Sequence, residues 1–213
     1  MRKKHNEIRR LLTIEAARLM YEEGVGQYLD AKRMAAKRIL GKDTRLLPSN
    51  GEIADELHRI SCFHQADTHQ STLFDMRLLA LDVMDDLDPF SPRLIGSVST
   101  GRIRKGSDID IHVFCDFLEI LYRHLDALGW CYKSRQICIQ RNSRPVEYTH
   151  VYLDREYPVE LSVYPSNEIR ITGRSSTDGK PIHRVSVSRL RAMIEEEHPD
   201  EWFQYIVGNQ VSL

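Results

Sequence analysis

The sequence has few cysteines, and their spacing is not typical of a disulfide framework or a zinc site. Its four cysteines, among 213 residues, include no Cys-x-x-Cys pair, so neither a disulfide framework nor a common zinc module is expected. No apolar run approaches the ~18 residues of a transmembrane helix, and the basic start of the chain is not followed by the apolar block of a signal peptide. We therefore expect a protein with no membrane partner, in the reducing environment of the cytoplasm.

Neither sign of charge is in excess over the whole chain, which has 30 Lys and Arg against 31 Asp and Glu. With 41% hydrophobic residues, this balance excludes a disordered or fibrous chain and predicts one or two globular domains. The charges are unevenly placed, however, because residues 1–40 carry ten basic and five acidic residues whereas residues 51–90 carry two and nine. This asymmetry indicates either a nucleic-acid-facing arm or helix faces whose opposite charges meet in the fold.

Residues 1–90 are predicted to form a helical N-terminal region. Apolar residues recur at the i, i+3, i+4 spacing of one helix face over residues 8–20 and again over residues 28–40. Ser49 and Glu52 have the spacing of a capping box, which starts a third helix. A fourth helix is expected over residues 71–87, and because it is apolar nearly all round it should be buried between other elements.

From residue 93 onward, short β-type runs replace the helical pattern. These runs are rich in Val, Ile and Tyr and are separated by turn residues. Further helices are expected over residues 117–128 and 188–197. The expected fold class is therefore α+β, in which residues 91–213 form a mixed sheet with flanking helices, ending in a C-terminal helix. The predicted strands cover residues 94–96, 108–115, 131–140, 146–154 and 157–164.

The residues with the clearest chemistry lie between positions 94 and 114. Asp108 and Asp110 are two apart on a predicted strand, so both carboxylates project from one face while Ile109 and Ile111 project from the other. Neighbouring carboxylates repel one another unless a cation or a shared proton neutralises them. All-oxygen ligation favours Mg²⁺ or Mn²⁺ over zinc, and Mg²⁺ usually completes its shell with substrate phosphates. The pattern therefore predicts a nucleoside triphosphate (NTP) as ligand.

Gly96 and Ser97 come directly after an apolar run, just upstream of these acids. A glycine allows close backbone approach, and a serine hydroxyl with successive N–H groups can hold an anion. Gly96-Ser97, ten intervening residues and then Asp108-Ile109-Asp110 resemble the signature of the DNA polymerase β-like nucleotidyltransferase superfamily, and are most similar to its minimal bacterial branch. Gly101 and Ser107 also match positions that are often Gly and Ser in those enzymes.

The resemblance implies a catalytic metal site built from three carboxylates. Asp108 and Asp110 would supply two, and the third would come from a later strand with apolar neighbours. We favour Glu160, because the apolar residues on either side of it alternate into a core and leave Glu160 on the opposite face. Glu147 and Asp154 are the rival candidates for this third ligand.

The resemblance also implies nucleotide-binding residues, some of which have a simpler interpretation as solvated loop charges. The basic segment 165–191 has two interpretations as well: a hairpin that turns at Asp178-Gly179, or a basic lip over the nucleotide or acceptor. The candidate nucleotide-binding residues are Gly96, Ser97, Ser107, Arg102 and Lys105.

The expected function is transfer of a nucleoside monophosphate from NTP to a hydroxyl group with release of pyrophosphate, by two-metal phosphoryl transfer. The sequence leaves the acceptor open among a small molecule such as an aminoglycoside, an RNA end and a protein side chain. Two alternative functions are a nucleotide-sensing DNA-binding regulator that uses the N-terminal helices, and an antitoxin-like partner that modifies a companion protein. The role of the helical region and a homodimer contact are also left open.

Overall fold

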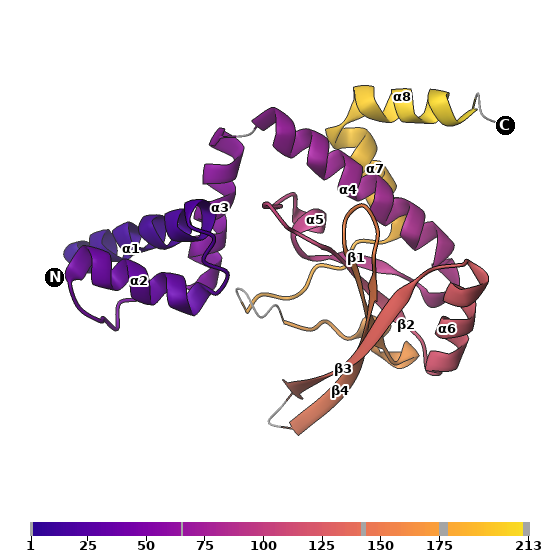
Figure 1. Ribbon diagram of the computed structural model, residues 1–213, viewed down its shortest axis with the longest axis horizontal. Helices are drawn as coiled ribbons and strands as arrows, with labels where there is room; N and C mark the ends of the chain where they lie inside the picture. The colour runs from indigo at the N-terminus through magenta and orange to yellow at the C-terminus, as the bar shows by residue number, and fades with distance from the viewer. Residues whose placement is uncertain (1, 65, 142–143, 175–178, 211–213) are drawn as a thin grey trace. The chain divides into compact units, whose positions relative to one another are not determined.

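The computed structural model describes residues 2–64, 66–141, 144–174 and 179–210. The chain divides into two compact units, one made of the described residues of 1–69 and 174–180 and the other of those of 70–173 and 181–213. Helix α4 (Ala66–Asp86) begins in the first unit and lies mostly in the second. Helices come first and a five-stranded mixed sheet follows (Figure 1), which confirms the predicted α+β class.

The first unit contains three helices that pack around a small apolar core. They are α1 (Arg2–Glu22), α2 (Tyr28–Leu40) and α3 (Asn50–His64). The capping box is confirmed, because Ser49 N donates to a Glu52 carboxylate oxygen at 2.7 Å and Glu52 N donates to Ser49 Oγ at 3.2 Å. The buried side chains of this core are Leu12, Ala16, Ala17, Leu19, Met20, Ala31, Ala35, Ala36, Ile53 and Leu57.

Charges of opposite sign meet on the surface of this unit. Arg9 lies 2.6 Å from Glu52, and this contact is the main reason that the pKa of Glu52 falls to about 2. Arg38 pairs with Glu23 at 2.7 Å. Because several of its arginines already face carboxylates, the basic excess of residues 1–40 agrees better with paired helix faces than with a nucleic-acid-facing arm.

The second unit is built on a sheet whose strands lie in the order β1-β2-β5-β4-β3. Strands β2 and β5 are parallel neighbours, and the other pairings are antiparallel. The strands are β1 (Arg93–Ile95), β2 (Ile109–Phe114), β3 (Tyr132–Arg141), β4 (Arg144–Leu153) and β5 (Val159–Tyr164). The helical elements are η1 (Asp88–Phe90), α5 (Gly96–Thr100), α6 (Leu118–Ala127), η2 (Ser166–Arg170), α7 (Val187–Glu197) and α8 (Pro199–Gln210).

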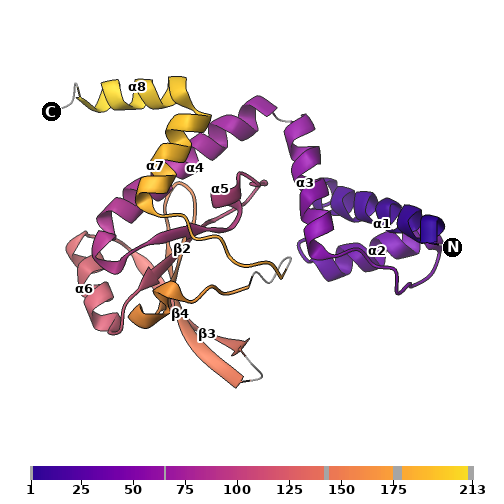
Figure 2. The ribbon, with the colours of Figure 1, turned by 180° about the vertical axis from the view of Figure 1, so that it is seen from behind.

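The core of this unit lies on one face of the sheet. Ile109, Ile111 and Leu161 are 1% exposed or less and pack with buried side chains of α4, α6 and α7. Helices α4 and α7 lie side by side (Figures 1 and 2), and Arg191 of α7 bonds to Asp85 of α4 at 3.0 Å. Because side chains alternate along a strand, the opposite face of β2 and β5 carries their polar residues.

Some elements differ from the sequence prediction. Helix α4 begins at Ala66, earlier than expected, and the chain after residue 197 forms a further helix, α8, in which Trp202 is buried. In the predicted hairpin of 165–191, Asp178 lies outside the described residues, and a short 3₁₀ helix occupies residues 166–170. Among the described residues, no helix combines the length and the apolar character needed to cross a membrane.

Candidate metal and nucleotide site

Three carboxylates converge at one end of the parallel pair β2 and β5. Asp110 of β2 is in register with Glu160 of β5, and Asp108 lies just before β2. One oxygen from each of the three carboxylates lies within 4.8 Å of the other two. The parallel pairing explains this arrangement, because residues in register on neighbouring strands project from the same face of the sheet.

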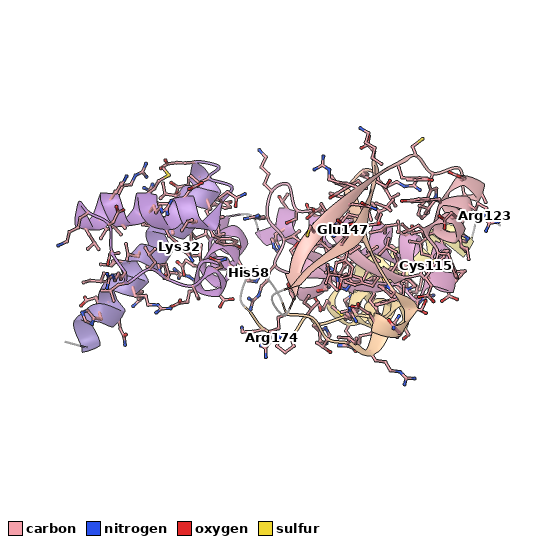
Figure 3. The ribbon with its side chains drawn as sticks, turned by 90° about the horizontal axis from the view of Figure 1, so that it is seen from below. Lys32, His58, Cys115, Arg123, Glu147 and Arg174 are labelled. Carbon is pink, nitrogen blue, oxygen red and sulfur yellow. The ribbon has the colours of Figure 1, made fainter. Side chains whose placement is uncertain are left out.

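The two rival acids lie elsewhere, Glu147 on strand β4 and Asp154 just after it. Glu147, labelled in Figure 3, is in register with Cys138 on the β3–β4 hairpin. This part of β4 does not pair with β5. Asp154 follows the last residue of β4 and is exposed. The structure thus brings Glu160, and neither rival, together with Asp108 and Asp110.

The glycine at position 96 is required by its surroundings. Its φ of 71° lies in the left-handed region, which is costly for a residue with a side chain. A Cβ atom at this position would also overlap Oδ2 of Asp110. The Gly96-Ser97 corner therefore lies directly against the carboxylate cluster, an arrangement that only glycine permits.

A buried arginine, Arg77, bonds to helix α5, which begins at Gly96. The Arg77 side chain is 1% exposed; its Nε donates to the Val98 carbonyl of α5 at 3.3 Å and its Nη1 donates to Glu197 of α7 at 2.7 Å. Ser99 Oγ donates to the Gly96 carbonyl at 2.9 Å and steadies the turn from within. Sequence reasoning did not single out Arg77, because its partners lie 21 and 120 residues away.

The pKa of Asp110 reflects both its burial and the repulsion among the carboxylates. Burial, followed by the negative charges of Asp108 and Glu160, raises the pKa of Asp110 to about 7, while the nearby His150 opposes this rise. The group is thus held partly protonated near neutral pH in the absence of a cation. This is the electrostatic condition that a divalent ion would relieve.

Sequence reasoning also did not single out a histidine that lies beside the cluster. His150 of β4 places its Nδ1 2.7 Å from Glu160 Oε1, and its Nε2 is buried without a hydrogen-bond partner. Tyr152, two residues along the same strand, has a raised pKa through burial and then the charge of Glu160. The signal that could have located both residues is the alternation of β4, which places Tyr148, His150 and Tyr152 on one face.

His112, two residues along β2 from Asp110, is a buried structural histidine. It is 2% exposed, and its Nδ1 accepts a bond from Arg184 Nε at 3.1 Å. Burial, and then the positive charge of Arg184, lower the pKa of His112 to about 3. The imidazole is therefore neutral at physiological pH and serves as an acceptor.

The remaining predicted nucleotide-binding residues lie in α5 and the loop that follows it. Ser97 is the second residue of α5 and is partly exposed. Ser107 Oγ accepts from Arg104 N at 2.9 Å and closes a turn before β2. Arg102 and Lys105 are exposed in the same loop. The structure places these four residues between the glycine corner and the first acid, and their contact with a nucleotide stays a prediction.

The residues present fit a divalent cation. The donors are three carboxylate oxygens with no sulfur or imidazole among them, which is the ligand type that Mg²⁺ and Mn²⁺ prefer. Burial, and then the charges of Asp108 and Glu160, raise the pKa of Asp110, and a bound cation would oppose this rise. These observations describe an acidic cluster able to hold a metal ion.

The comparisons with known proteins add little to this geometry. No protein-family model and no curated protein sequence matches the chain. Among solved structures, the chain is similar to a chain of the GLD-2/RNP-8 complex, with 16% identity and a TM-score of 0.29. The match covers 46% of this chain and 43% of that one. A likeness this distant assigns neither a family nor an activity.

Proposed function

We propose that the protein is a metal-dependent nucleotidyltransferase that moves a nucleoside monophosphate from NTP to a hydroxyl group. The proposal is carried by the convergence of Asp108, Asp110 and Glu160 within 4.8 Å of one another, next to a glycine corner that a side chain could not occupy. The sequence resemblance to polymerase β-like nucleotidyltransferases supports the same reaction. In this reaction, the acceptor oxygen attacks the α-phosphorus, the bond to pyrophosphate breaks, and the hydroxyl proton passes to a carboxylate or to water.

In this proposal, the three carboxylates hold one or two Mg²⁺ or Mn²⁺ ions. Such ions neutralise charge on the phosphates and lower the pKa of a bound hydroxyl. Gly96 lets the start of α5 approach the Asp110 carboxylate closely, and Ser97 would offer its hydroxyl and backbone N–H to the triphosphate. Arg77 fixes the position of α5 through the Val98 carbonyl. Most of the rate acceleration would then come from positioning and electrostatics.

The proposal is tested by transfer of label from NTP. The full-length chain is incubated with each α-labelled NTP in turn, with Mg²⁺ or Mn²⁺, and with RNA, lysate protein or small hydroxyl compounds. We expect metal-dependent labelling of one acceptor class, reduced at least about a hundredfold by Asp110→Asn. Asp154→Asn is the matched control, because it makes the same change of side chain at an acid that lies outside the carboxylate cluster.

Two results would overturn the proposal. One is the absence of transfer with every donor and acceptor class. The other is transfer that survives Asp110→Asn, or that is lost equally in Asp154→Asn, because the carboxylate cluster would then have no special part in the reaction.

A further inference from the structure

One face of β4 carries a histidine that reaches across to the carboxylate cluster. In the antiparallel pair of β4 and β5, Tyr152 is in register with Glu160. His150 is in register with Ser162, two residues along β5 on the same face. His150 and Glu160 are therefore diagonal neighbours, at a separation that long side chains can bridge. Because Ser162 is small, the imidazole of His150 has room to lean towards Glu160.

His150 and Glu160 meet at hydrogen-bonding distance in a largely buried place. Nδ1 of His150 lies 2.7 Å from Oε1 of Glu160, and the two side chains are 15% and 22% exposed. Because an ionised carboxylate can only accept, the hydrogen between these atoms belongs to Nδ1. The other ring nitrogen, Nε2, is buried without a hydrogen-bond partner, so a hydrogen placed there would be unpaired at a cost in free energy. The ring is thus a donor to Glu160 through Nδ1.

Glu160 is the member of the cluster whose carboxylate is the most mobile by its chemistry. A glutamate has one more rotatable bond than an aspartate, and it is among the side chains that lose most rotamer freedom when they are fixed. Within the described part of the chain, neither Asp108 nor Asp110 pairs with a basic side chain, and His150 is the basic residue that pairs with Glu160. The support from outside the cluster therefore acts on the ligand with the most freedom to lose.

The donor is itself held in a fixed position. Strand β4 pairs with β5 on one side and with β3 on the other, and His150 lies opposite Ser162 and Arg135 in these two pairings. Tyr148, two residues along the same face of β4, is 6% exposed and packs against Tyr164 with 4.7 Å between ring centroids. Because the strand cannot shift without breaking these contacts, Nδ1 is in place before any cation binds.

We infer that His150 is a positioning residue for the metal site, whose Nδ1 fixes the Glu160 carboxylate in place beside Asp108 and Asp110. The inference rests on the proposed function for the role of the cluster as a metal site. Hydrogen bonds from outside the coordination shell orient ligating carboxylates, and loss of such a partner weakens metal binding about 10–100-fold. The converging ligand atoms belong to the three carboxylates, so His150 acts through Glu160.

The test measures the Mn²⁺ affinity of the full-length chain without nucleotide, from the EPR signal of free Mn²⁺. His150→Asn keeps a donor at the place of Nδ1, because the asparagine amide nitrogen and Nδ1 are both bonded to Cγ. His150→Leu has nearly the shape of asparagine but no donor. We expect His150→Leu to weaken Mn²⁺ binding about tenfold or more, and His150→Asn to stay within about threefold of the unmodified protein.

His124→Leu is the matched control. His124 is also a partly exposed histidine that contacts an oxygen, the Asp86 carbonyl at 2.8 Å, but it lies on α6. This variant should bind Mn²⁺ as the unmodified protein does, whereas Asp110→Asn should lose the binding, since the ion is held by the cluster. Circular dichroism in EDTA checks that each variant folds. If His150→Leu does not fold, His150→Gln takes its place with the same expectation, because its amide nitrogen matches Nε2 and not Nδ1.

Several results would overturn the inference. One is that His150→Leu binds Mn²⁺ as the unmodified protein does. Another is that His150→Asn loses as much affinity as His150→Leu, because the ring itself would then matter and not its Nδ1 donor. The inference also fails if the unmodified protein binds no Mn²⁺, if binding survives Asp110→Asn, or if His124→Leu weakens binding as much as His150→Leu.

The same variants separate this inference from the proposed function. In the transfer reaction, His150→Leu should raise the Mg²⁺ concentration for half-maximal rate about tenfold and leave the rate at saturating Mg²⁺ within about fivefold. A chain that binds Mn²⁺ with the expected order of variants but transfers no label would refute the proposed function and retain the role of His150. An active His150→Leu with unchanged Mg²⁺ dependence and Mn²⁺ affinity would refute that role and retain the proposed function.

Discussion

Replacing Asp110 with asparagine should stabilise the metal-free protein at alkaline pH, although it removes a proposed metal ligand. In the folded state, burial and the charges of Asp108 and Glu160 raise the pKa of this carboxyl from its usual 3.8 to about 7. Above pH 7 the fold therefore has to hold an ionised group that its surroundings disfavour. An asparagine of the same shape carries no charge and avoids this penalty.

The size of this stability penalty, and the pH range over which it appears, follow from proton linkage. Between about pH 4 and pH 7, the folded state retains a proton on Asp110 that the unfolded chain has released. The contribution of this group to the free energy of unfolding is therefore largest below about pH 4 and falls as the pH rises towards 7. The difference between the two pKa values corresponds to on the order of 4 kcal/mol, and to less where water reaches the carboxylate. In a chain of this length, 1 kcal/mol shifts the melting temperature by about 2–4 °C.

The assay is thermal unfolding in EDTA at pH 5 and pH 8, followed by circular dichroism. We expect Asp110→Asn to melt several degrees above the unmodified protein at pH 8 and to show a much smaller advantage at pH 5. Asp154→Asn should melt close to the unmodified protein at both values. An Asp110→Asn variant that is less stable at pH 8, or that gains equally at both pH values, would refute the reasoning. Added Mg²⁺ should raise the melting temperature of the unmodified protein alone.

Three further predictions concern the same unit. Gly96→Ala should destabilise the fold by more than 1 kcal/mol in urea unfolding and abolish transfer, because the new Cβ needs a left-handed φ and overlaps Asp110; a fully active variant would contradict this. Arg77→Met should cost less stability in urea than Glu197→Ala, since the latter leaves the guanidinium buried without its partner; the reverse order would count against it. The His112 ring should show no titration by NMR between pH 5 and 8, because its pKa is lowered to about 3; a midpoint near 6.5 would contradict its neutral, buried state.

The parts of the site that could be predicted from the sequence are those that lie close together along the chain. Asp108 and Asp110 are two residues apart, so the period of a strand is enough to place both carboxylates on one face. The glycine corner was also predictable, because a glycine after an apolar run is a recognisable local signal. The capping box at Ser49 belongs to the same class of short-range feature.

The rest depends on contacts between distant segments. The apolar alternation around Glu160 favours it over its rivals at the sequence level, but its position opposite Asp110 follows from the register between β2 and β5, which joins residues 50 positions apart. The bond between Arg184 and His112 spans 72 positions, and the contact of His150 with Glu160 depends on the pairing of β4 with β5. Sequence periodicity predicts which face a residue occupies, but not which residue lies opposite it.

The position of the acids on central strands explains why a cation, rather than a rearrangement, should relieve their repulsion. Asp110 lies between Ile109 and Ile111, which are 1% exposed or less in the core, and β2 is paired on both sides. Moving the backbone of Asp110 away from Glu160 would pull these side chains out of the core and break strand hydrogen bonds, at a cost of several kcal/mol. The fold thus keeps the three carboxylates together at a cost in stability, and a bound divalent ion would return part of that stability.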